Sequence, residues 1–238
     1  MKTRVLSQFD QGYVFNRKEI EESLTPAYLQ FLKEAGIADL DKTPDLFVAK
    51  YVLKKDERVE GVIREQGLNC KYAKDKTVVN IPHQDARKLV YNLGGIVLPV
   101  GVMYKLIIPG LKQAAGEGNE SAGETLEQMI KGYAEWLEDQ RVSDKKRLKI
   151  GTSEITIVLP DIDGIFDRED IDEFGYPTNV EYQGEFHYWK PRRDEGAAVR
   201  DGGSGLGLDL DWGPFNVSGR LGVRFAKFFS GINLRKFL

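Results

Sequence analysis

The sequence predicts an α+β fold, because helical and extended apolar patterns both occur in a chain long enough to bury a core. Apolar residues recur every three or four positions between residues 28 and 35, which is typical of one face of a helix. Between residues 206 and 211 they alternate with polar residues, which is typical of a strand with one buried face. At 238 residues the chain can form one large domain or two small ones. We expect a small helical N-terminal extension over residues 1–45 and a main domain over residues 46–238.

Two short helices are expected in the N-terminal extension. Asn16 can cap the first helix, and Glu19, three residues later, completes a capping box. Thr25 precedes Pro26, which suits the first position of a second helix. Gly36 then follows the last apolar residue of the stripe, where a glycine commonly ends a helix. The stripe of this second helix more often packs against a core than forms a groove for a partner.

The first half of the main domain is expected to mix strands and helices. We predict a strand over residues 46–53, a short helix over 59–65, a hairpin built from 68–72 and 77–81, and a helix over 83–91. The apolar stretch 97–110 permits a helix, but Pro109 limits its length because proline has no amide hydrogen to donate.

A long amphipathic helix is predicted over residues 124–140, after a small, polar and exposed loop at 116–123. The residues expected on its inner face are Leu126, Met129, Ile130, Tyr133, Ala134 and Leu137. A second hairpin is expected from residues 148–150 and 155–159.

The segment from residue 161 to residue 173 is acidic, and it can be interpreted in two ways. It holds seven carboxylates, but no glycine stands at the sixth position of a calcium-binding EF-hand loop. A solvated loop is therefore favoured over a structural calcium site, which stays open as the alternative.

The alternation near the carboxyl end is the most informative pattern in the chain. Leu206, Leu208 and Leu210 are expected to face inward, while Gly207, Asp209 and Asp211 face outward. A short closing run carries apolar residues at 221, 223 and 225. We expect residues 186–188 and these last strands to pair in an antiparallel sheet. A rigid sheet with a polar, loop-rich surface is how recognition sites are usually built.

Composition and charge argue against several classes of function. The net charge of −3 gives no electrostatic reason to bind nucleic acid or an anionic membrane. Cys70 is the single cysteine and only two histidines occur, so neither a disulfide nor a structural zinc site is expected. The most apolar window, residues 94–111, is too short and too interrupted by prolines to span a membrane. We expect no cofactor, no nucleic acid and no membrane span. The first residues do not form a secretory signal, which predicts a product that is cytoplasmic on synthesis.

Two stretches of sequence together resemble a known family. Residues 79–99 read VNIPHQDA, continue to YNLGG and end on IVLP, and residues 221–226 read LGVRFA. Their order and spacing resemble the C-type-lectin-like domains of the formylglycine-generating-enzyme branch, and most closely the variable proteins of diversity-generating retroelements. Those proteins occur in phages, archaeal viruses and microbes with small genomes. The resemblance covers roughly residues 77–112 and 180–228.

The resemblance implies a C-type-lectin-like fold whose C-terminal surface binds a protein or other macromolecular target and varies by error-prone reverse transcription. Leucines and other apolar residues of the last strands would form the scaffold. The residues that would be displayed are Arg200, Asp201, Gly203, Ser204, Asp209, Asp211, Gly213, Asn216, Ser218 and Arg220. The catalytic cysteines of the branch and the calcium-binding triplets of sugar-binding lectins are missing, so neither activity is carried over. We therefore expect a binding protein rather than an enzyme, with receptor recognition, possible incorporation into a virion and no predicted oligomeric state.

Other interpretations remain open at this point. The glycines at 202, 203 and 205 are also typical of simple turns, and Asp209 and Asp211 are also typical of the solvent-exposed face of an edge strand. Pairs of carboxylates, Asp161 with Asp163 or Asp209 with Asp211, could serve a hydrolase as general acid and base. The helices between residues 17 and 35 could instead mediate assembly of a virion or another structure.

Overall fold

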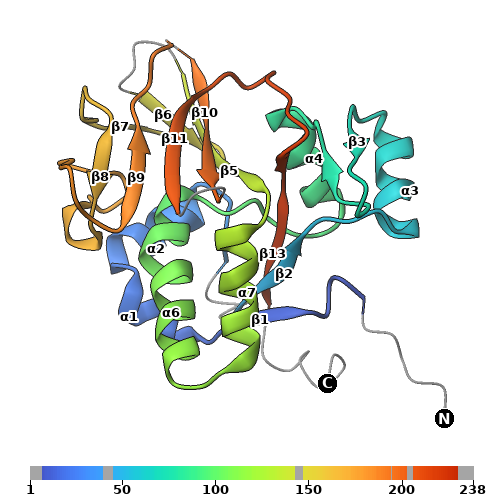
Figure 1. Cartoon of the computed structure of the whole chain (residues 1–238), viewed down its shortest axis with the longest axis horizontal. Helices are drawn as coiled ribbons and strands as arrows, with labels where there is room; N and C mark the ends of the chain where they lie inside the picture. The colour runs from blue at the N-terminus through green and yellow to red at the C-terminus, as the bar shows by residue number, and fades with distance from the viewer. Residues whose placement is uncertain (1–6, 40–44, 143–146, 194, 203–205, 230–238) are drawn as a thin grey trace.

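The computed structural model describes residues 7–39, 45–142, 147–193, 195–202 and 206–229, and its class is α+β as predicted (Figure 1). The helices are α1 (Arg17–Ser23), α2 (Pro26–Glu34), α3 (Glu57–Gln66), α4 (His83–Asn92), α5 (Val100–Val102), α6 (Ile108–Gly116) and α7 (Glu120–Lys131). A π-helical turn, η1 (Met103–Ile107), joins α5 to α6, and a 3-10 turn, η2 (Arg168–Asp170), lies in the acidic segment.

The largest sheet contains most of the C-terminal strands. Its strand order is β7-β6-β5-β10-β11-β9-β8, and β12 pairs with β5 outside this path. The strands are β5 (Ala134–Arg141), β6 (Arg147–Ile150), β7 (Ser153–Thr156), β8 (Gly164–Phe166), β9 (Phe186–Trp189), β10 (Gly196–Asp201), β11 (Gly207–Trp212) and β12 (Leu221–Gly222). Strands β5, β10 and β11 therefore lie in the interior of the sheet, where each has a neighbour on both sides.

A second sheet joins the two ends of the described chain. Its order is β1-β2-β13, with β1 (Gly12–Phe15), β2 (Asp45–Val52) and β13 (Arg224–Phe229) all antiparallel to their neighbours. A separate hairpin pairs β3 (Lys71–Tyr72) with β4 (Val78–Val79). Figure 1 shows β3 with α3 and α4 on one side of β13, and the large sheet on the other side.

Two apolar clusters pack on opposite faces of the large sheet, and the smaller one covers mainly the part built from β5, β10 and β12. The larger cluster collects Leu206, Leu208 and Leu210 with the helices α1, α2, α6 and α7. The smaller cluster collects Trp136, Val199 and the closing residues around Leu221 with α3 and α4. Strand β5 contributes to both clusters, since Leu137 belongs to the first and Trp136 to the second. A strand buried on both faces is the rigid centre of this fold.

Local helix signals are confirmed where they were predicted. Asn16 accepts a hydrogen bond from the backbone of Glu19, and the Glu19 side chain accepts one from the backbone of Asn16, which completes the capping box. Thr25 caps α2, with Pro26 at its first position. The strand at 45–52, the helices α3 and α4, and the hairpins at 71–79 and 147–156 also occur, with ends shifted by a few residues.

The long helix predicted over residues 124–140 is wrong. Helix α7 ends at Lys131, and the chain then forms β5 from Ala134. Gly132 marks the change of structure, because its backbone is extended at ψ −161° and a β-carbon there would collide with the carbonyl oxygen of Gln128. Apolar residues that lie on one helical face in the sequence are thus divided between a helix and a strand.

The helix around Pro109 is longer than predicted. It continues through the proline to Gly116, because Pro109 is the second residue of α6 and follows the wide π-helical turn. In that turn the amide of Ile108 donates to the carbonyl of Met103, five residues earlier. The proline therefore sits near a helix start, where its missing amide costs little.

The pairing of the last strands also differs from the prediction. Residues 186–188 were expected to pair antiparallel with the last strands, but β9 pairs parallel with β11, and β13 lies in the other sheet. Nor do residues 12–38 form a separate extension. Phe15, Leu24 and Leu32 are fully buried in the larger cluster, and β1 pairs with β2. The boundary at residue 45 therefore divides one continuous core.

Candidate functional site

The candidate site is the face of the large sheet that carries the polar residues of β11, which we call the outward face. Cross-strand register places residues of several strands in rows on this face. One row contains Glu181, Ile165, His187, Gly207 and Asp201. The next row contains Trp189, Asp209 and Val199. Asp201 and Asp209 therefore share one face, as predicted, and Leu208 lies on the opposite face.

Aromatic side chains cover the middle of the outward face. The rings of His187 and Trp189 stack, with centroids 5.7 Å apart and planes at 23°. The indole of Trp189 lies directly over Gly207, because a β-carbon on that glycine would come within 2.5 Å of the ring. Gly207 is thus required for space, since any side chain there would displace the indole. Trp189 itself is half-buried.

The carboxylates of β11 organise the loops around them. Asp209 accepts hydrogen bonds from the amide of Asp211 and from the indole nitrogen of Trp212, both at 2.8 Å. Burial raises the pKa of Asp209 above its ordinary value, although these two hydrogen bonds oppose the shift. Asp211 in turn accepts a hydrogen bond from the amide of Arg192 at 3.0 Å. These carboxylates are half-buried and engaged, so they are less free than a fully solvated display residue would be.

Arg192 links β11 to the acidic segment. Its guanidinium lies 2.5 Å from a carboxylate oxygen of Asp163 and 3.9 Å from one of Asp211. Lys190 lies beside it, and its amide donates to Asp163 at 2.9 Å. The first part of the acidic segment is therefore held to the site by basic residues of the segment after β9.

The prediction that Arg200 is displayed is wrong, because its side chain is fully buried. Arg200 pairs with Leu208 in the β10–β11 register, so it points away from the outward face. Its guanidinium donates to Glu135 at 2.8 Å and to the carbonyl oxygens of Met129 and Tyr133 at 2.5 and 2.8 Å. It therefore belongs to the frame that holds the site.

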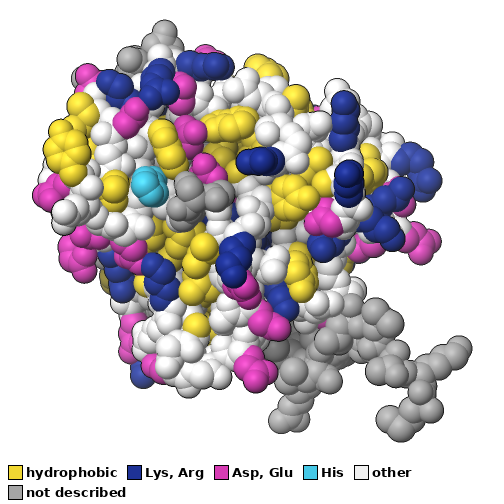
Figure 2. Space-filling model, in the orientation of Figure 1, with side chains coloured by type: hydrophobic (Ala, Val, Ile, Leu, Met, Phe, Trp, Pro, Cys, Tyr) yellow, Lys and Arg dark blue, Asp and Glu magenta, His cyan; other side chains and the backbone are white. Residues whose placement is uncertain are grey.

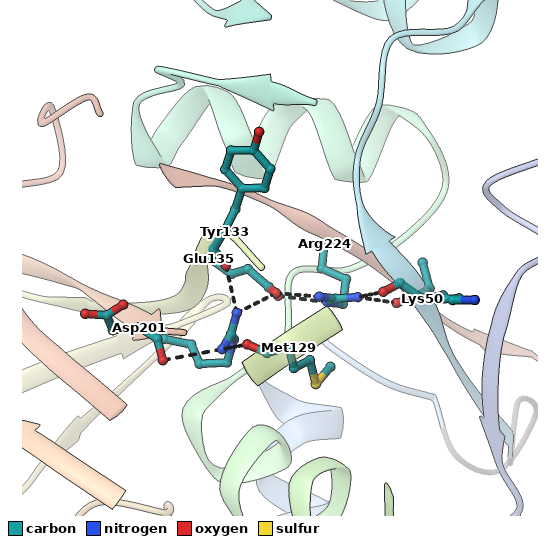
Figure 3. A network of polar contacts seen from close by, with 8 residues as sticks. Lys50, Met129, Tyr133, Glu135, Asp201 and Arg224 are labelled. Carbon is teal, nitrogen blue, oxygen red and sulfur yellow. Dashed lines mark hydrogen bonds and ion pairs between the residues drawn. The ribbon is translucent and has the colours of Figure 1, made fainter. Parts of the chain in front are cut away.

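Glu135 joins Arg200 to a second buried arginine, Arg224 (Figure 3). Arg224 makes two hydrogen bonds to the carboxylate, at 2.9 and 2.6 Å, and donates to the carbonyl oxygens of Ala49 and Lys50. Burial would raise the pKa of Glu135, but the two guanidinium groups outweigh it and hold the pKa below its ordinary value. This group ties β5 and β10 of the large sheet to β2 and β13 of the small one.

The loop after β11 carries the remaining predicted residues. Asn216 and Ser218 are half-buried, Arg220 is exposed, and Phe215 and Val217, on either side of Asn216, are 75% and 52% exposed. Gly213 is buried against Arg193 and Asn216, so the prediction that it is displayed is wrong. The predicted residues Gly203 and Ser204 lie outside the described residues.

The pairing of β12 and β10 with β5 shows how far the loop after β11 lies from the end of β10. Leu221 pairs with Ala134 on one side of β5, and Arg200 pairs with Glu135 on the other side. Asp201 and Arg220, which adjoin those pairs, are therefore separated by roughly two strand spacings, about 10 Å. Both predicted residues thus lie at the same end of β5.

A hollow of about 300 Å³ lies at the β8–β9 side of the outward face. Its lining residues are Asp163, Gly164, Ile165, Glu181, Tyr182, His187, Tyr188 and Trp189. Figure 2 shows this side of the molecule, where apolar, acidic and basic side chains and a histidine lie close together over β8, β9 and β11. Sequence reasoning missed this hollow. The available signal was the alternation of His187 and Trp189 in a strand whose other residues, Phe186 and Tyr188, are buried.

The described residues hold no group of three or more histidine, cysteine or carboxylate side chains placed to bind a metal ion. In the acidic segment, Asp172 accepts backbone hydrogen bonds from Phe174 and Tyr176, each at 2.9 Å. Within the described part of the chain, no helix is long and apolar enough to cross a lipid bilayer.

Comparison with protein-family models, with curated proteins and with solved structures found no match to this chain. The C-type-lectin-like resemblance therefore rests on the sequence motifs. The protein has a mixed α+β architecture, and its last strands carry polar and aromatic side chains on one face.

Proposed function

We propose that this protein is a ligand-binding display protein of the C-type-lectin-like class, whose outward face and following loop recognise a macromolecular target. One observation carries the proposal. Leu206, Leu208 and Leu210 are at most 5% exposed, while Asp201 and Asp209 between and beside them share the opposite face. Such a division lets the recognition residues change without disturbing the frame that holds them.

The frame is rigid for identifiable reasons. Leu208, Leu221 and Val223 are fully buried, and the Glu135 group fixes the two sheets to each other from inside. Binding to a pre-formed surface loses little conformational entropy, because the backbone is already ordered. A few side chains can therefore supply the affinity.

Exposed aromatic residues around the face support binding of a macromolecule. Phe215 is 75% exposed in the loop after β11, and Tyr182 is 98% exposed beside the hollow. Large aromatic side chains supply much of the free energy in protein interfaces because they bury a large area at low entropic cost. Both residues are therefore available as anchors for a macromolecular target.

The two alternatives find less support among the described residues. Asp209 and Asp163 each accept hydrogen bonds from neighbouring protein groups, which is the arrangement of loop-building carboxylates rather than of a free acid and base. The apolar stripe of α1 and α2 is buried in the core, with Ile20, Tyr28 and Leu32 at most 1% exposed. That stripe is therefore not available as an assembly surface.

The genetic locus gives the most direct test of the proposal. We expect a reverse-transcriptase gene nearby and a near-duplicate of the codons for roughly the last forty residues, a span that includes β11 and the loop after it but not β8 and β9. Between related copies, codons 209, 216 and 220 should differ, whereas those of Leu208 and Leu221 should not. Sequencing the neighbourhood and several related loci checks this. A locus with neither the gene nor the duplicate would refute the display function.

Substitutions on the face and in the frame should have very different effects on stability. A triple variant, Phe215→Ala, Asn216→Ala and Arg220→Ala, should keep its free energy of unfolding within about 1 kcal/mol of the original, because Phe215 and Arg220 are exposed and Asn216 is only half-buried. Leu208→Ala should lose about 2–5 kcal/mol, which lowers Tm by roughly 4–20 °C in a chain of this size. Thermal unfolding followed by circular dichroism measures both. A large loss in the triple variant would show that these residues belong to the frame.

A further inference from the structure

The hollow beside β9 combines aromatic rings with carboxylates. Tyr182, His187 and Trp189 provide three aromatic side chains, and Asp163 and Glu181 provide two carboxylates. Glu181 and His187 lie on either side of Ile165 in one cross-strand row, so their α-carbons are about 10 Å apart across the floor of the hollow. That width accommodates one flat polar group between a carboxylate and a pair of stacked rings.

The charge around the hollow is not balanced. Arg192 lies against Asp163, and Lys190 donates to the carbonyl of Asp161, so both of these basic residues already have acidic or polar partners. Glu181 is exposed, and among the described residues no basic side chain lies within ion-pair distance of it. Asp209 adds a further carboxylate in the row of Trp189. The outward face therefore presents negative charge next to aromatic rings, which favours a cationic ligand.

The shape of the hollow limits the size of that ligand. Its volume of about 300 Å³ is at the lower end of the range for small-molecule sites, and it opens onto an exposed face. Such a hollow encloses the end of a side chain more readily than a whole metabolite. A guanidinium fits better than an ammonium, because it is planar, stacks on aromatic rings and can donate two parallel hydrogen bonds to a carboxylate.

We propose that this hollow binds an arginine side chain of the target, with the guanidinium stacked beside Trp189 and His187 and hydrogen-bonded to Glu181. This inference rests on the proposed function, since the hollow belongs to the outward face that meets the target. It adds the chemistry of one recognised group, which the display function by itself leaves unspecified.

Short peptides test the inference on the full chain. Two-dimensional NMR titrations would compare an acetylated, amidated Gly-Arg-Gly peptide with the same peptide carrying citrulline, which has the shape of arginine without its charge. We expect millimolar binding of the arginine peptide, with shifts at the amides of Ile165, Glu181 and His187, and at least ~5-fold weaker binding of the citrulline peptide. A lysine peptide should also bind more weakly than the arginine peptide. Equal affinity for citrulline or for lysine would overturn the assignment.

Variants locate the binding in the hollow. Trp189→Ala should weaken binding of the arginine peptide about 10-fold and Glu181→Gln about 3–10-fold. Trp189→Phe keeps an aromatic ring, so it should retain most of the affinity for the arginine peptide. A phenylalanine variant that binds shows that the loss in the alanine variant comes from the missing ring. Matched controls outside the hollow, Tyr72→Ala in β3 and Glu57→Gln in α3, should leave the affinity unchanged. Equal loss in the controls would overturn the site.

The outcomes of this experiment and of the locus test are distinguishable. Absence of peptide binding together with a retroelement at the locus would refute the arginine site alone. Peptide binding at Trp189 without the retroelement would refute the display function and leave the arginine site standing.

Discussion

Replacing Glu135 by glutamine should lower the free energy of unfolding by about 3–5 kcal/mol. The carboxylate is 1% exposed and is shared by Arg200 and Arg224, which are themselves at most 2% exposed. Glutamine has nearly the same shape but no charge, so two guanidinium groups would remain buried with only carbonyl oxygens as partners. Removing one member of a buried ion pair is costly because the remaining charge has lost its solvent and its partner together.

Urea unfolding followed by circular dichroism measures this effect. Glu124→Gln is the matched control, because its ion pair with Lys50 is 2.7 Å long but the carboxylate is 58% exposed. A surface pair of this kind contributes at most about 1 kcal/mol. Similar losses in the two variants would show that the buried group does not hold the sheets together.

The position of β5 could not be predicted from the sequence. Trp136, Leu137 and Asp139 are all buried, since one core covers each face of the strand, and a strand buried on both faces shows no alternation of apolar and polar residues. Its apolar residues also continued the helical spacing of α7, so the helix was extended too far. In contrast, the capping box at Asn16 depends only on residues three apart, and it was predicted correctly.

The candidate site was predicted in part for a related reason. Alternation within β11 correctly separated Leu208 from Asp209, because both residues lie on one strand whose direction is fixed. Arg200 lies on the neighbouring strand, and which face it occupies depends on the register between β10 and β11. Register depends on tertiary contacts, as does the bridge between Ile165 and Glu181 that shapes the hollow. Neither could be inferred from local spacing.

The contribution of Asp139 to the free energy of unfolding should fall as the pH rises from about 4 to about 7. Asp139 is fully buried and accepts hydrogen bonds from the hydroxyl of Tyr176 at 2.7 Å and from the amide of Val100 at 2.8 Å. Burial raises its pKa to about 7, and the neighbouring carboxylate of Glu138 adds to the rise. In the unfolded chain the same group has a pKa near ~3.9. Between these two values the folded state binds a proton that the unfolded state does not, so raising the pH removes up to about 4 kcal/mol of stability.

The variant Asp139→Asn isolates this contribution. Asparagine keeps one oxygen that can accept from the amide of Val100, and its NH2 group can donate to the hydroxyl oxygen of Tyr176. It does not titrate, so the difference in stability between the original protein and the variant should shrink or reverse as the pH rises from 4 to 8. His83 has the opposite effect on the pH dependence of stability. Burial lowers its pKa to about 4, so between this value and pH ~6.5 the unfolded chain binds a proton that the folded protein does not. That contribution is common to both proteins and cancels in the difference. Urea unfolding at several pH values gives the difference directly, and a value that stays constant across the range would show that Asp139 is ionised in the folded protein throughout.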